Sequence, residues 1–136
     1  MKWKREYELG IPVIDTQHKQ LFRFGTELED ALKRGLKVSS ITDLLINVKQ
    51  YTARHFYIEE KYMDDISYPE LPKQKEAHTA FVIRFSEIQE KFDKEGISPA
   101  LVDMIRNELI SWIDSHITGM DQEFGDYYRN NSTASS

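Results

Sequence analysis

The sequence predicts an all-α fold, an antiparallel up-down-up-down four-helix bundle with an ordered N-terminal arm. Three observations support this fold class. Apolar residues recur at spacings of three and four in four long segments, and capping residues, glycine and proline separate these segments. No segment shows the apolar-polar alternation of a strand. Short connections between amphipathic helices favour antiparallel packing.

Length and composition fit one domain with one core. The chain has 136 residues, 40% hydrophobic and 30% charged. A net charge of −5 without a basic cluster argues against a nucleic-acid partner. Cysteine is absent, which excludes disulfides and thiolate metal ligands. No signal-peptide pattern or membrane-length apolar stretch is present, so we expect a cytoplasmic protein without a membrane partner.

An N-terminal arm of residues 1–14 precedes the first expected helix. Its apolar residues are numerous enough for it to lie along the body. The first helix is expected to begin with Asp15 as N-cap and to end at Arg34, before Gly35. Its inward stripe contains His18, Leu21, Phe22, Gly25, Leu28 and Leu32.

The second helix is expected to open at Ser39 and Ser40, with Asp43 completing a capping box. The proline-containing segment 64–72 should end it and form the connection. Its inward stripe contains Ile41, Leu44, Leu45, Val48, Tyr51 or Thr52, His55, Glu59 and Met63.

The third helix is expected to run from Leu71 or Lys73 to Lys94, before Gly96. Its stripe contains an amide and an imidazole among aromatic and aliphatic residues. The stripe residues are Gln74, His78, Phe81, Val82, Phe85, Ile88 and Phe92.

The fourth helix should begin with Ser98 as N-cap and Pro99 at the first helical position, and Gly119 should end it. Its inward residues are Leu101, Met104 or Ile105, Leu109, Trp112, Ile113 and His116. We expect the bundle to span residues 1–128 and residues 129–136 to form a frayed C-terminal tail.

The four histidines, His18, His55, His78 and His116, each fall on the inward stripe of a different helix. One inward histidine alone is more often a hydrogen-bonded core residue than a ligand. Four imidazoles in one small core carry a desolvation cost unless something binds their lone pairs. A divalent metal does so, and the interior of a helix bundle suits such a site.

Two carboxylates point to the same place. Glu59 follows His55 by four residues, so both side chains share one helix face. Asp121 follows His116 by five residues, about 140° around an unbroken helix, but a stop at Gly119 would let the chain bring it back. Four imidazoles and two carboxylates exceed the needs of one tetrahedral zinc and favour two ions of iron, zinc or manganese.

With these residues in place, the sequence closely resembles the hemerythrin family, specifically single-domain bacteriohemerythrins. The resemblance covers about residues 1–128. The matching motifs are Trp3, Gly10-Ile11, Ile14-Asp15-Thr16-Gln17-His18-Lys19, His55-Phe56-x-x-Glu59-Glu60-x-x-Met63, Tyr68-Pro69, His78 and Trp112-x-x-x-His116-x-x-x-x-Asp121.

The resemblance implies a non-heme centre of two iron ions that binds dioxygen reversibly, as a carrier, store or sensor rather than an enzyme. One iron would take His18 and His55 and keep an open position, and the other would take His78 and His116. The two carboxylates would bridge the ions, with an oxo or hydroxo group as third bridge. A dry oxygen pocket would be lined by Leu21, Phe56, Trp112 and Ile113.

One position departs from the family pattern His-x-x-x-His, because this chain reads Gln74-Lys75-Glu76-Ala77-His78. Gln74 still faces inward but offers only a neutral amide, which is a poorer iron ligand than imidazole. Three outcomes are open: weak coordination through the Gln74 oxygen, a water or small anion in its place, or substitution by Glu70 or another nearby group.

We expect the iron pair to assemble with a weakened second site and a less durable oxygen adduct. The alternative function is a diiron enzyme that acts on peroxide or nitric oxide at the extra open position. A third interpretation is an interaction bundle that has lost its metal. The oligomeric state and the redox partner do not follow from the residues.

Overall fold

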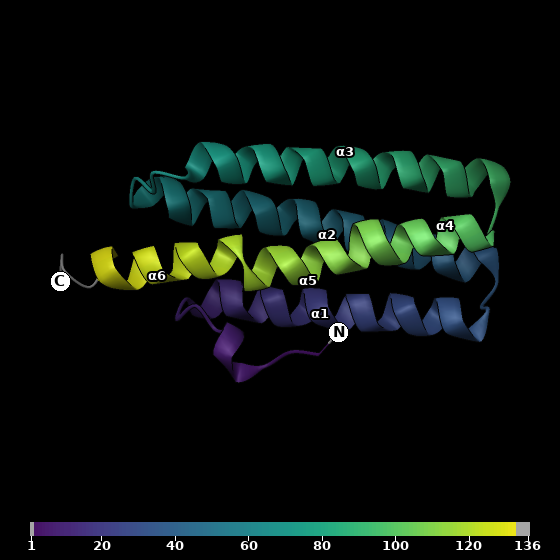
Figure 1. Ribbon diagram of the computed structural model, residues 1–136, viewed down its shortest axis with the longest axis horizontal. Coiled ribbons are helices and arrows are strands. Elements are labelled where there is room, and N and C mark those ends of the chain that lie inside the picture. Colours follow the sequence, from purple (N-terminus) through teal and green to yellow (C-terminus); the bar gives the residue numbers. More distant parts are fainter. Residues whose placement is uncertain (1, 133–136) are drawn as a thin grey trace.

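The computed structural model describes residues 2–132, which form an antiparallel bundle of helices without a strand (Figure 1). The elements are the short helix η1 (Arg5–Tyr7), α1 (Pro12–Arg34), α2 (Val38–Asp65), α3 (Leu71–Glu95), α4 (Pro99–Met104), the π-helical segment η2 (Ile105–Ile110), α5 (Ser111–Thr118) and α6 (Met120–Ser132). The last four follow one line and make the fourth rod of the bundle. The predicted all-α four-helix architecture is confirmed.

The rods bury two apolar clusters. α1 packs against α2, α2 against α3, α4 and η2 against α3, and α5 against α1. The larger cluster fills most of the bundle and contains Phe22, Leu45, Phe85 and Ile105. The smaller one joins the N-terminal arm to the start of α3 and to α6 and contains Leu9, Ile11, Ile14, Met63, Tyr68 and Phe124. Along the chain, the predicted ligands other than His55 and His116 fall between members of the two clusters, and these two histidines directly precede Phe56 and Ile117 of the larger cluster. Buried apolar residues therefore lie on both sides of the candidate site.

The start of α1 differs from the prediction that Asp15 is its N-cap. The helix begins three residues earlier, at Pro12, whose fixed φ suits the first helical position. The Asp15 carboxylate reaches back instead and accepts hydrogen bonds from the Leu9 N–H at 2.7 Å and the Gly10 N–H at 3.1 Å. Because Gly10 has a φ of 87°, the chain can turn there into the arm. Asp15 therefore fixes the arm rather than capping its own helix.

The predicted serine cap of α2 is also wrong. The helix begins at Val38, and its N-cap, Lys37, makes no side-chain capping bond. Gly35 ends α1 in the left-handed conformation with a φ of 61°. Only two residues then separate Gly35 from the start of α2 at Val38, so Ser39 and Ser40 lie in the first turn of α2.

The fourth rod starts as predicted but is not one regular helix. The Leu101 N–H donates to the Ser98 hydroxyl at 3.1 Å, which confirms the N-cap. Its buried apolar residues then recur every four positions, a step that overshoots a regular helical turn by about 40°. The wider π-helical turn of η2 compensates for this drift. These residues are Leu101, Ile105, Leu109, Ile113 and Ile117.

Gly119 interrupts the rod, as the sequence indicates. A Cβ atom at this position would lie 2.8 Å from the Ser115 carbonyl oxygen, so the backbone as it stands has no room for a side chain. A new helix, α6, starts directly after it. The expected frayed tail is helical through Ser132, and Arg129 Nη1 donates to the Leu9 carbonyl at 2.7 Å. Residues 133–136 of that expected tail lie outside the described residues.

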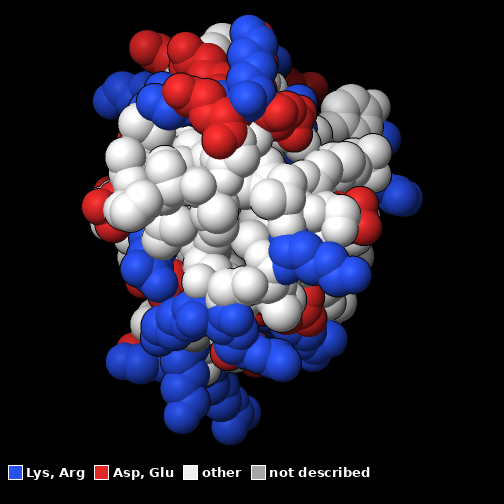
Figure 2. Space-filling model, turned by 90° about the vertical axis from the view of Figure 1, so that its right-hand side faces the viewer, with Lys and Arg blue, Asp and Glu red and all other residues white. Residues whose placement is uncertain are grey.

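The α1–α2 and α3–α4 connections form the end of the bundle seen in Figure 2. The centre of this end is uncharged, and Lys and Arg gather along one rim. Leu36 and Ile97 in these connections and Val38, the first residue of α2, are exposed. The larger apolar cluster separates this surface from the predicted ligands.

Among the described residues, no helix combines the length and the apolar character that crossing a membrane requires.

Candidate metal centre

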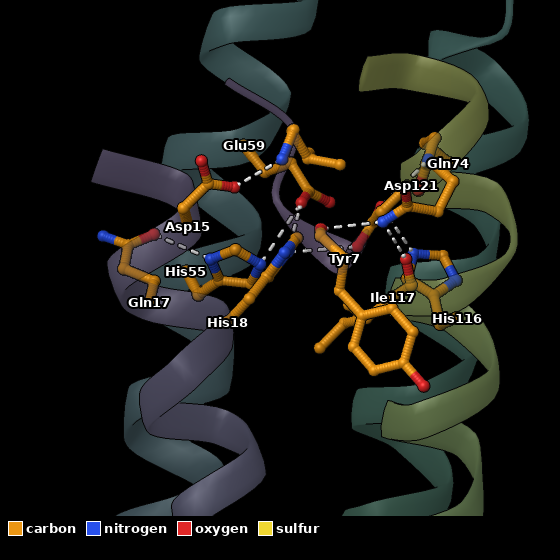
Figure 3. A network of polar contacts seen from close by, with 12 residues as sticks. Tyr7, Asp15, Gln17, His18, His55, Glu59, Gln74, His116, Ile117 and Asp121 are labelled. Carbon is orange, nitrogen blue, oxygen red and sulfur yellow. Dashed lines mark hydrogen bonds and ion pairs between the residues drawn. The ribbon is translucent and has the colours of Figure 1, made fainter. Parts of the chain in front are cut away.

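Every rod contributes polar side chains to one buried cluster (Figure 3). In Figure 3, His18 and His55 lie on one side of Glu59, and Gln74, Asp121 and His116 lie on the other. All seven predicted ligands are here, with exposed fractions between 0% and 6%. They are His18 from α1, His55 and Glu59 from α2, Gln74 and His78 from α3, His116 from α5 and Asp121 from α6.

One half of the cluster is formed by two histidines and two carboxylates. His18 Nε2 lies 3.1 Å from Glu59 Oε2 and 3.2 Å from Asp121 Oδ2. His55 Nε2 lies 3.3 Å from the same Glu59 oxygen. The ligand atoms of these four residues all lie within 4.8 Å of one another, close enough to bind one cation.

The other half uses the same two carboxylates with the other two histidines. His78 Nε2 lies 3.3 Å from Glu59 Oε1 and 3.2 Å from His116 Nε2. His116 Nε2 lies 3.3 Å from Asp121 Oδ1. These four residues again offer ligand atoms within 4.8 Å of one another. Glu59 and Asp121 therefore stand between two candidate cation positions, as bridging carboxylates would.

The hydrogen bonding of the cluster is incomplete in a way that a cation would repair. Among the described residues, Gln74 Oε1 is buried without a hydrogen-bond partner, and Glu59 Oε1 and Asp121 Oδ2 have only the imidazole nitrogens of His78 and His18, at 3.3 and 3.2 Å. A buried acceptor without a partner carries a desolvation penalty of about 1–3 kcal/mol. Imidazole and carboxylate together suit divalent iron, zinc or manganese. The donor set thus fits a pair of cations.

Two neighbouring side chains hold the histidines in orientation. His55 Nδ1 lies 2.7 Å from Gln17 Oε1, and His78 Nδ1 lies 2.8 Å from Glu60 Oε2. A ligand histidine that donates its second N–H in this way presents Nε2 to the metal. The sequence reasoning missed both roles, although Gln17 directly precedes one predicted ligand and Glu60 directly follows another.

The charges of the cluster change its protonation. Burial lowers the pKa of His18, but hydrogen bonds and charges from Asp121 and Glu59 outweigh it and raise that pKa to about 10. Burial raises the pKa of Glu59, but the surrounding histidines hold it well below its ordinary value. The pKa of His78 is raised because Glu59 and Glu60 outweigh the effect of burial. Without a cation, protonated histidines are stabilised by the neighbouring carboxylates. A metal that binds the same nitrogens has to displace these protons.

Gln74 occupies the position that the motif gives to a histidine. It is completely buried, and its Nε2 donates to Asp121 Oδ1 at 3.2 Å while its Oε1 stays unpaired. Glu70, considered above as a substitute ligand, lies outside both ligand groups. Its side chain is 45% exposed and pairs with Lys73 at 3.0 Å. The amide, not the carboxylate, is therefore the group available to the second cation.

A small cavity adjoins the cluster, and the four predicted pocket residues all line it. The lining residues are Leu21, Thr52, His55, Phe56, Trp112, Ile113, His116, Ile117 and Asp121. The cavity measures about 10 Å³, which is enough for roughly one water-sized molecule. Trp112 stacks on His116 with ring centres 4.4 Å apart, and Phe56 stacks on His78 at 3.8 Å. Thr52, expected only as an alternative to Tyr51 on the inward stripe, and Ile117 are the two lining residues that were predicted neither as ligands nor as pocket residues.

In this four-helix bundle, histidines from all the rods surround two shared carboxylates. These features define the class of protein: helical bundles that hold two cations. Comparison with known proteins gives the family. Residues 9–128 match the family model Hemerythrin HHE cation binding domain, and the chain belongs to the hemerythrin family.

Curated relatives agree with this assignment. The chain is similar to a bacteriohemerythrin of Clostridium acetobutylicum, with 31% identity over 91% of this chain and 98% of that protein. It is similar to a bacteriohemerythrin of Stenotrophomonas maltophilia, with 31% identity over 91% of this chain and 78% of that protein. A myohemerythrin of Theromyzon tessulatum is 24% identical over 90% of this chain and 89% of that protein. As a hemerythrin, the protein is a diiron, oxygen-binding protein.

Proposed function

We propose that the protein binds dioxygen reversibly, as a carrier, store or sensor, and that Gln74 weakens its second iron position. One observation carries the proposal: two ligand groups, each with two histidines, share Glu59 and Asp121. Iron is the redox-active metal that gives such a centre its affinity for oxygen. The seven cluster residues would hold it, with Gln74 as the weakest donor.

The chain supplies an enclosed and mostly apolar site for a small ligand. The cavity borders the cluster at His55 and His116, and Leu21, Phe56 and Ile113 are almost fully buried around it. A site of this kind excludes bulk water, which protects a bound ligand from proton exchange and the metals from hydrolysis. The Gln74 amide contacts Asp121 Oδ1, the oxygen that faces His116, so it belongs to the His78–His116 half. The His18–His55 half has no such additional donor among its ligand group, which supports placing the open position there.

The weakening follows from the chemistry of the amide. Gln74 can offer Oε1 to a cation while its Nε2 remains on Asp121, but a neutral carbonyl oxygen is a weaker donor than imidazole. Water or a small anion would then compete for this position. We infer that the oxygen adduct is shorter-lived than in a protein with histidine there.

Oxygen titration tests the proposal. Iron-loaded protein is reduced, kept anaerobic and titrated with dioxygen, and Gln74→His serves as the matched variant. We expect both proteins to give an oxygen-dependent absorption band that argon removes, and the band to last longer in Gln74→His. Equal lifetimes would refute the weakening, and the absence of a reversible band in both would refute reversible binding.

The same proteins separate the alternative functions. Turnover of peroxide or nitric oxide with a reductant, faster in the wild type than in Gln74→His, would favour an enzyme that uses the extra open position. Less than one iron per chain after growth with iron would favour a bundle without a metal role. We expect about two irons per chain and little turnover.

A further inference from the structure

Thr52 carries a buried hydroxyl without a hydrogen-bond partner among residues 2–132. Its side chain is 1% exposed, and its Oγ1 makes no hydrogen bond to any of them. A buried hydroxyl without a partner is unfavourable, so its persistence calls for a physical reason.

The usual partner of a helical hydroxyl is the carbonyl four residues earlier. Other hydroxyls of this chain bond in this way: Thr26 to Phe22, Ser86 to Val82 and Thr118 to Asp114, at 2.8–3.1 Å. The Thr52 hydroxyl does not, although it lies inside the regular helix α2. Its orientation therefore differs from that of these three hydroxyls.

The surroundings of Thr52 explain the difference. It lines the cavity beside the cluster and is the only hydroxyl among the nine lining residues. It precedes His55 by three residues, so both side chains lie on the same face of α2, one turn apart. The hydroxyl is thus placed beside the His18–His55 half of the centre, where the open position is proposed.

We propose that Thr52 is a hydrogen-bond donor to the small ligand held in this cavity. The ligands it favours have a charged or strongly polar outer atom, such as azide, over wholly apolar molecules of the same size. This inference rests on the proposed function, because it requires a ligand at the His18–His55 position. The residue acts on ligand selection and retention and is not needed for binding iron.

Azide binding to the iron-loaded, oxidised protein tests this inference. Thr52→Val keeps the branched shape and removes the donor, and Thr52→Ser keeps the donor. Because a hydrogen bond to a charged acceptor is stronger than a neutral one, we expect Thr52→Val to bind azide about tenfold more weakly. Thr52→Ser should stay within about twofold of the wild type, and both variants should keep the wild-type iron content.

A second readout distinguishes a hydrogen bond from a change of cavity shape. The infrared band of bound azide should shift between H₂O and D₂O in the wild type and in Thr52→Ser, and should shift less in Thr52→Val. The dissociation of oxygen should also be faster in Thr52→Val. If Thr52→Val fails to load iron, Thr52→Ala provides a second variant without the donor.

The outcomes separate this inference from the proposed function. Unchanged azide affinity and an unchanged band in the donor-free variants, with a ligand-binding wild type, would overturn the role of Thr52 alone. A wild type that holds two irons but binds neither azide nor oxygen would overturn the proposed function and this inference together.

Discussion

Gln74 and Asp121 are joined by a hydrogen bond of 3.2 Å from the amide nitrogen to a carboxylate oxygen. The amide therefore orients Asp121, which we propose as a bridging carboxylate, while its own oxygen remains available to a cation. A histidine at this position would offer a nitrogen to the metal, whereas Gln74 supports the carboxylate proposed to bridge the two ions. Its replacement by an apolar residue should accordingly harm the site.

Substitutions of Gln74 should change the iron affinity of the second cation position in a predictable order. We expect Gln74→Leu to hold this iron less tightly than the wild type, since it removes a donor and leaves Asp121 without the amide, and Gln74→His to hold it more tightly. Iron per chain after a timed chelator challenge measures the order. A Gln74→Leu variant that retains iron as well as the wild type would show that the amide contributes nothing.

Glu60 should strengthen the same position through His78. Loss of a hydrogen-bonding partner behind a ligand histidine costs about 10- to 100-fold in metal affinity. We therefore expect Glu60→Gln, which keeps the size but not the charge, to weaken iron binding within this range in a competitive chelator titration. Glu76→Gln, an exposed change on the neighbouring helix, is the matched control. Equal affinities in both variants would contradict the role of Glu60.

The metal-free protein should lose stability as the pH rises from 6.5 to about 10. The folded-state pKa of His18 is raised above its ordinary 6.5, so its stabilisation is complete below 6.5 and disappears as the pH passes about 10. Glu59 has a lowered pKa, so its contribution is lost only on the acid side of 4.5. Melting temperatures over this range test the sign. In His18→Gln, the melting temperature should fall less steeply with pH. An equally steep fall in that variant would show that another group causes the pH dependence.

Removal of the Thr52 hydroxyl should stabilise the metal-free protein even while it weakens ligand binding. Thr52→Val replaces a buried, unpaired hydroxyl by a methyl group of similar shape. We expect the free energy of unfolding to rise by about 1 kcal/mol, measured by urea denaturation. A loss of stability would mean that the hydroxyl has a partner within the fold.

The N-terminal arm should be sensitive to added volume at Gly125. A Cβ atom there would lie 2.8 Å from Leu9 Cδ2 and 3.2 Å from Leu9 Cβ. We expect Gly125→Ala to cost about 1–3 kcal/mol by displacing the arm, whereas exposed Asn130→Ala in the same helix should have little effect. Urea denaturation compares the two. Equal stabilities would show that the arm can shift freely.

The bundle and the ligand positions follow from the sequence because helical periodicity is itself geometric. A histidine on an apolar stripe has to face the core, and four such stripes meet in one place. The glycine before Asp121 also indicated how a residue outside the stripe could join the others. The four pocket residues were predicted from the family resemblance, and they line one cavity.

Other features depend on tertiary contacts that periodicity does not encode. Asp15 is a good N-cap residue, but the arm offered it two backbone N–H groups and Pro12 began the helix earlier. The π-helical segment reflects the misfit between a four-residue repeat and the helical turn over the whole rod. The roles of Gln17 and Glu60 depend on which imidazole nitrogen faces inward, which spacing alone leaves undetermined.

The break at Gly119 makes the register between α5 and α6 part of the metal centre. Asp121 reaches the cluster only because the rod restarts there with a new phase, and the close Ser115 carbonyl leaves space for hydrogen alone. Removing one residue from this junction would turn the carboxylate by about 100° on a continued helix. A position with no side chain can thus matter as much to the geometry of the candidate metal centre as one of its imidazoles.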